Sequence, residues 1–92
     1  MMDAENSPPP VVSYPTDYMF KVMGEAAEDF ASHVEGLITP HTGPILAENL
    51  VTRRSNQGRY QSVTVRVRLV SEDQRRAIYQ ALHDDSRVVM YL

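Results

Sequence analysis

Cysteine is absent from this chain of 92 residues. Its absence excludes a disulfide framework and a thiolate nucleophile, so packing must stabilise the fold. Long apolar runs are also missing, because no stretch approaches the roughly 20 residues that span a bilayer. The N-terminus is acidic and rich in proline, where a signal peptide would be basic and then apolar. We therefore expect a cytoplasmic protein without a membrane segment.

Basic residues are scarce in the first half of the chain. Residues 1–48 contain eight acids and one base, Lys21, whereas residues 49–92 contain eight arginines and four acids. Seven of these arginines fall within residues 53–76. This asymmetry has two interpretations, a solvated surface balanced by acidic helices or a surface that binds anions or a partner.

The length and the proline distribution predict one domain with a tail. A chain of 92 residues builds a single small core. Residues 1–15 contain four prolines, three of them consecutive, which exclude a helix and favour an extended, solvated segment. We predict a disordered tail over residues 1–15 and a folded domain over residues 16–92.

Hydrophobic periodicity predicts a strand and then a helix after the tail. Residues 17–24 alternate, with Phe20 and Val22 on one face and Lys21 on the other, as in a half-buried strand. Apolar residues between 27 and 38 follow the spacing of an amphipathic helix. Glu25 and Glu28 are expected in its first turn, and Pro40 is expected to end it.

The next segment predicts a β-hairpin. Residues 45–54 form the expected second strand, and Ser55 to Gly58 form a turn of residues that tolerate a left-handed backbone. From Tyr60 onward the third strand alternates strictly, with Val63, Val65, Val67 and Leu69 facing the core.

A second helix and a last strand complete the pattern. Ser71 and Gln74 match a capping box, in which each side chain bonds a backbone N–H near the helix start. Residues 87–92 are apolar and too short for a helix, so a buried terminal strand is expected. The order βαββαβ predicts an α+β, ferredoxin-like sandwich, a four-stranded antiparallel sheet with both helices on one face.

Four segments match the pattern of a known family: Tyr14-Pro15-Thr16, the strand end Phe20 to Gly24, the hairpin residues Ser55, Gly58, Tyr60, Ser62 and Val63, and the closing segment 88–92. Together they resemble the YbeD-like family of small bacterial proteins of unknown function. The resemblance implies a ferredoxin-like fold similar to ACT regulatory domains and a link to lipoate or amino-acid metabolism. It implies no catalytic residues, because none are assigned in that family.

These observations favour a non-enzymatic regulatory or protein-interaction module. If the valines of the third strand face the helices, Lys21, Tyr60, Arg66 and Arg68 lie together on an open sheet face. Such a face can bind an acidic protein or a second copy of the domain. Gly24 has the position at which ACT-like domains bring the backbone close to a small-molecule ligand, although a simple strand-to-helix turn explains it better.

RNA binding is the alternative function, because RNA-recognition domains share this strand order and stack bases on the open face. The consensus aromatics of those domains are missing, and the sequence pI is about 5.5. An enzyme is less favoured, since His33, His41 and His83 have no spacing typical of a metal site or a triad. We therefore predict no catalytic residues, no metal and no cofactor.

Overall fold

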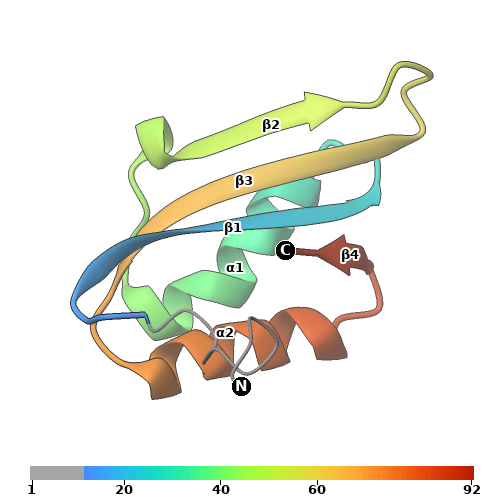
Figure 1. The fold of residues 1–92 in the computed structure, drawn as a ribbon. Helices are drawn as coiled ribbons and strands as arrows, with labels where there is room; N and C mark the ends of the chain where they lie inside the picture. Colours follow the sequence, from blue (N-terminus) through green and yellow to red (C-terminus); the bar gives the residue numbers. More distant parts are fainter. Residues whose placement is uncertain (1–11) are drawn as a thin grey trace, which may run out of the picture.

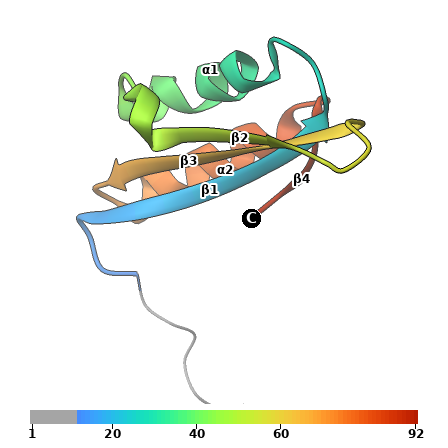
Figure 2. The same cartoon turned by 90° about the horizontal axis from the view of Figure 1, so that it is seen from above.

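A computed structural model describes residues 12–92 as one sheet covered by two helices. The four strands are antiparallel in the order β2-β3-β1-β4, and both helices cover the same face (Figures 1 and 2). This arrangement confirms the predicted ferredoxin-like βαββαβ fold. The elements in chain order are β1 (Thr16–Glu25), α1 (Phe30–Thr42), a 3-10 helix η2 (Ala47–Asn49), β2 (Leu50–Arg54), β3 (Tyr60–Leu69), α2 (Glu72–Asp84) and β4 (Val88–Tyr91).

The centre of the sheet is the pair β1 and β3, which are matched from Thr16 opposite Leu69 to Glu25 opposite Tyr60. Successive side chains of a strand point to opposite faces, so one apolar set from each strand meets the helices. The predicted alternation in both strands is confirmed. The buried core consists of Phe20, Val22, Phe30, Val34, Ile38, Val63, Val65, Val67, Leu69, Ile78 and Leu82.

Two local sequence signals have the predicted geometry. Gly58 has φ of 74° in the turn between β2 and β3, a left-handed conformation that favours glycine. Ser71 caps α2, because its Oγ accepts a hydrogen bond from the Gln74 N–H at 3.1 Å. The Gln74 side chain reaches one residue farther than expected and accepts from the Val70 N–H at 2.6 Å.

The bounds predicted for the first helix are wrong. α1 begins at Phe30, so Glu25 lies in β1 and Glu28 precedes the helix rather than standing in its first turn. Pro40 lies inside the helix, which continues to Thr42. The proline falls in the last turn and removes only the bond to the carbonyl of Gly36, an exposed residue, so the cost is small.

The second and fourth strands also differ from the prediction. Residues 45–49, predicted as part of the second strand, contain the 3-10 helix η2 instead. β2 therefore has only five residues. β4 pairs with β1 alone and stands at the sheet edge, and Val89 and Met90 are 63% and 52% exposed. The predicted buried strand is therefore an edge strand, because apolar composition does not tell the centre of a sheet from its edge.

Residues 1–11 of the predicted tail lie outside the described part of the chain. Tyr14, placed in that tail by the sequence, is half-buried against the core, and its hydroxyl donates to Glu72 Oε1 at 2.6 Å. Among the described residues, no helix is long and apolar enough to cross a membrane.

Candidate functional site

The candidate site is the face of the sheet that the helices leave uncovered, here called the open sheet face. Both helices pack against the opposite face, where their buried side chains share one core with those of β1 and β3. In β3 the buried residues 61, 63, 65, 67 and 69 alternate with side chains of this face. Residues directly opposite in a sheet share a face. The register therefore assigns to it Asp17, Met19, Lys21, Met23, Glu25, Val51, Arg53, Tyr60, Ser62, Thr64, Arg66, Arg68 and Met90.

Four of the five predicted site residues lie on this face. Lys21 is opposite Thr64, and Arg66 is opposite Met19. Arg68 is opposite Asp17, and its Nη1 lies 3.5 Å from the Asp17 carboxylate. Both groups of that pair are largely exposed, so the contact is weak. Tyr60 lies at the hairpin end and is 40% exposed.

Gly24 is the fifth predicted residue, and the structure places it on the helix side of the sheet. It is buried, and its backbone does not have positive φ. A Cβ built here would meet the Arg87 carbonyl oxygen and would lie 2.6 Å from the Phe30 ring. Close packing between β1, α1 and the start of β4 therefore accounts for this glycine.

The lysine and the eight arginines divide by location. Arg75 and Arg76 on α2 contact Glu72 at 2.6 and 3.2 Å, and Arg87 before β4 contacts Asp29 at 2.9 Å. On the sheet, only Arg68 has an ion pair among the described residues. The cations without one in residues 12–92 are Lys21, Arg53, Arg54, Arg59 and Arg66, all on β1, β2, β3 and their turn.

Aromatic side chains gather on the opposite side of the sheet. Tyr79 of α2 lies 4.9 Å from Phe20 and 5.7 Å from Tyr91, measured between ring centroids. Its hydroxyl is 3.0 Å from that of Tyr18, and burial together with this bond raises the pKa of Tyr79. Tyr60 is the one aromatic residue that the register places on the open sheet face.

A polar cluster joins the start of β1 to the start of α2. Glu72 accepts two hydrogen bonds from Arg75, at 3.0 and 2.6 Å, one from Arg76 at 3.2 Å and one from Tyr14. The bonds from Arg75 and Tyr14 favour the ionised carboxylate and lower the pKa of Glu72 to about 2. Burial and then the bond to Glu72 raise the pKa of Tyr14, and the bonds to Glu72 raise the pKa of Arg75. The contacts of Glu72 with Arg75 and Arg76 have the i, i+3 and i, i+4 spacing of neighbours on a helix surface, so the sequence could have predicted them.

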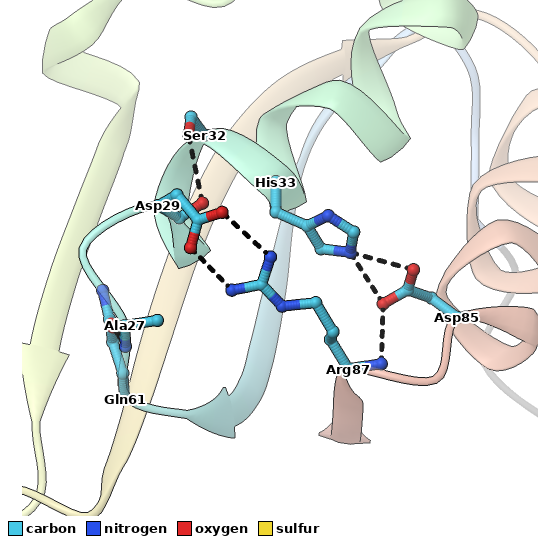
Figure 3. A network of polar contacts seen from close by, with 7 residues as sticks. All are labelled: Ala27, Asp29, Ser32, His33, Gln61, Asp85 and Arg87. Carbon is cyan, nitrogen blue, oxygen red and sulfur yellow. Dashed lines mark hydrogen bonds and ion pairs between the residues drawn. The ribbon is translucent and has the colours of Figure 1, made fainter.

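A second polar network, shown in Figure 3, joins α1 to the segment after α2. His33 Nε2 lies 2.9 Å from both carboxylate oxygens of Asp85, which also accepts from the Arg87 N–H at 3.1 Å. Arg87 donates two bonds to Asp29, and these lower the pKa of that carboxyl. His33 and Asp85 are 52 residues apart in sequence, and Asp29 and Arg87 are 58 residues apart. A local sequence pattern therefore cannot predict these contacts.

His33 and His41 lie on α1 and His83 lies on α2, and the three side chains have different surroundings. His33 contacts Asp85, His83 Nδ1 lies 3.2 Å from the Tyr91 hydroxyl, and the His41 carbonyl accepts from Gln74 Nε2 at 2.8 Å. Within residues 12–92, no group of three or more histidine or acidic side chains could hold a metal ion.

Comparison with known proteins gives relatives of closely similar length. A family model described as "Protein of unknown function (DUF493)" matches residues 9–92. A UPF0250 protein of Pseudomonas paraeruginosa is 38% identical over all of both chains. A UPF0250 protein of Nitrosomonas europaea is 32% identical over 89% of this chain and 94% of its own. The solution structure of protein HP0495 from Helicobacter pylori has a TM-score of 0.72 at 19% identity, covering 100% of this chain and 97% of that one, and supports the fold alone.

Proposed function

The chain belongs to the DUF493 family, which includes the UPF0250 and YbeD-like proteins, and we propose that it is a non-enzymatic protein-interaction module. Its open sheet face binds an acidic protein partner. As the resemblance given above implies, the module regulates a protein of lipoate or amino-acid metabolism, and the composition of the chain favours the cytoplasm as its location.

The distribution of ion pairs carries this proposal. Arg75, Arg76 and Arg87, on the helix side, each have a carboxylate partner within 3.2 Å. The five cations without a partner in the described chain all belong to the sheet and its hairpin turn. A surface with concentrated positive charge attracts an acidic partner and orients it during encounter.

The apolar side chains of the same face supply contact area. Met19 and Val51 are 51% and 55% exposed, and Met23 stands between Lys21 and the hairpin end. Unbranched methionine adapts to differing partner surfaces. The mixture of apolar side chains and basic groups is therefore suited to a protein interface rather than to a small buried ligand.

An acidic partner is favoured over a second copy bound through the same face. In a two-fold symmetric dimer the same patch meets itself, so the basic side chains would oppose one another. RNA binding is supported less, because Tyr60 alone offers a ring for base stacking on this face.

Charge reversal on β3 tests the proposal. The double variant Arg66→Glu and Arg68→Glu should lose capture of the partner from a cell extract, measured by affinity purification and mass spectrometry. Both side chains are exposed, so the thermal unfolding curve by circular dichroism should stay nearly unchanged.

Arg76→Glu is the control on the helix side, where it reverses the charge of one exposed arginine, half the change made by the double variant. It should keep the partner. Equal recovery with wild type and the β3 double variant would contradict the proposal. Capture of RNA in place of protein, with steep dependence on salt, would favour the alternative function.

A further inference from the structure

The open sheet face is hollowed along β3. Ser62 and Thr64 are short side chains at the centre of the sheet, and three of the four side chains opposite them on the neighbouring strands are longer. Their partners on β1 are Met23 and Lys21, and their partners on β2 are Arg53 and Val51. A floor of small residues between two walls makes a groove parallel to the strand, here called the β3 trough.

The two ends of the β3 trough differ in chemistry. At the hairpin end a hollow of about 230 Å³ is lined by Lys21, Met23, Arg53, Arg54, Ser55, Tyr60, Gln61 and Ser62. Three of these are basic and none is acidic. At the other end, near η2, a hollow of about 190 Å³ is lined by Met19, Glu48, Asn49, Val51, Thr64 and Arg66. Here apolar walls meet one acid and one base.

We propose that the β3 trough binds an extended segment of the acidic partner, with a carboxylate at the hairpin end and an apolar side chain at the η2 end. This inference rests on the proposed function and names the kind of segment that the face recognises. Lys21 and Arg53 approach the hairpin end from opposite walls, so a carboxylate between them receives charge-assisted hydrogen bonds from both sides.

The geometry of the trough sets the spacing of the partner residues. On β3, Ser62 lines the hairpin-end hollow, and Thr64 and Arg66, two and four residues farther along, line the η2-end hollow. An extended segment rises by about 3.3 Å per residue, as β3 does. The carboxylate and the apolar side chain should therefore be two or four residues apart, which places them on the same side of the partner strand.

A short synthetic peptide can probe the trough directly. It consists of serine and threonine with glutamates at one end and, two residues later, a leucine. Titrated into isotope-labelled protein, it should shift the NMR signals of Lys21, Met23, Arg53 and Ser62. A peptide with glutamine in place of glutamate should bind about tenfold more weakly, because it loses the charge-assisted bonds.

Single neutralising variants supply the matched comparison. Arg53→Gln should weaken peptide binding about tenfold, whereas Arg76→Gln, on the helix side, should leave it unchanged. Val51→Ser should weaken the leucine peptide and have no effect on its serine analogue. Shifts that are absent, or equal for the glutamate and glutamine peptides, would overturn the inference.

The two proposals fail separately. If the double charge reversal on β3 abolishes partner capture while Arg53→Gln changes neither capture nor peptide binding, the trough is not the recognition site and the proposed function stands. If the double charge reversal leaves capture intact, the proposed function itself is overturned, and the trough inference with it.

Discussion

Gly24 illustrates how a residue with an apparent functional position can be explained by packing. Its sequence position suggested a site where the backbone approaches a ligand, and the structure instead presses it against Phe30 and the carbonyl of Arg87. The pairing register between β1 and β4 shifts between Met23 and Gly24. Parts of β1, α1 and the start of β4 therefore meet around the Gly24 α-carbon. Glycine is the residue that such a crossing requires.

Gly24→Ala should therefore destabilise the protein. The added methyl group would overlap the Phe30 ring, which is fully buried and has little room to move. Overpacking of this kind costs about 1–3 kcal/mol in the free energy of unfolding, measurable by urea denaturation.

Gly36→Ala is the control for this prediction. Gly36 lies on the exposed side of α1, and a Cβ there meets nothing within 4 Å. Alanine should raise the free energy of unfolding by about 0.5–1 kcal/mol, because it favours the helix more than glycine does. The two substitutions should thus change stability in opposite directions, and a neutral Gly24→Ala variant would contradict the packing argument.

At the scale of elements, two polar clusters hold the helices to the sheet. Tyr14 and Glu72 tie the chain before β1 to α2, while His33 and Asp85 tie α1 to the segment before β4. Both clusters lie on the helix side and satisfy their own charges. Among the described residues, the lysine and arginine side chains available to a partner are therefore those of the sheet and its hairpin turn.

The Glu72 cluster predicts a dependence of stability on pH. The pKa of Glu72 is lowered from its ordinary value of 4.5 to about 2 in the folded protein. A lowered carboxyl pKa contributes stability above the unfolded value, and that contribution is lost as the pH falls through the folded value. The melting temperature should therefore drop between pH 4.5 and pH 2, and Glu72→Gln should make the drop smaller.

Asp73→Asn provides the comparison for Glu72→Gln. Asp73 is exposed in the same turn of α2, and its side chain makes no hydrogen bond within the described part of the chain. The Asp73→Asn variant should show nearly the same dependence of the melting temperature on pH as the wild type. Identical pH profiles for wild type and Glu72→Gln would argue against the cluster.

For the molecule as a whole, the two faces of the sheet differ in composition. The helix side contains the core and the ion pairs of Arg75, Arg76 and Arg87, whereas Lys21, Arg53 and Arg66 have no ion pair within residues 12–92 and lie on the open side. In the proposed function, stability therefore depends on the helix side and partner binding on the open sheet face. Adjacent residues of β3 should respond to the same substitution in opposite ways.

Val65→Asp should unfold the domain, whereas Arg66→Asp should leave it folded. Val65 is 0% exposed, and an unpaired charge in that position costs several kcal/mol, comparable with a whole stability of about 5–15 kcal/mol. Arg66 is exposed on the other face. Dispersed NMR signals for the valine variant would refute the assignment of faces.

The sequence by itself determined the order of the elements, the inward faces of β1 and β3, the hairpin turn and the cap of α2. These features depend on contacts between near neighbours, which leave periodic or short-range patterns in the chain. Lys21, Tyr60, Arg66 and Arg68 could be assigned to the open sheet face for the same reason, since alternation within a strand determines the side of each residue.

Only the tertiary structure decided which strands stand at the edges, how far α1 extends and what surrounds Gly24. It also paired His33 with Asp85 and Arg87 with Asp29, across 52 and 58 residues. The β3 trough depends on the register of three strands, and that register places Arg53 and Lys21 on either side of β3. No local pattern contains this information, because contacts between distant segments exist only once the chain is folded.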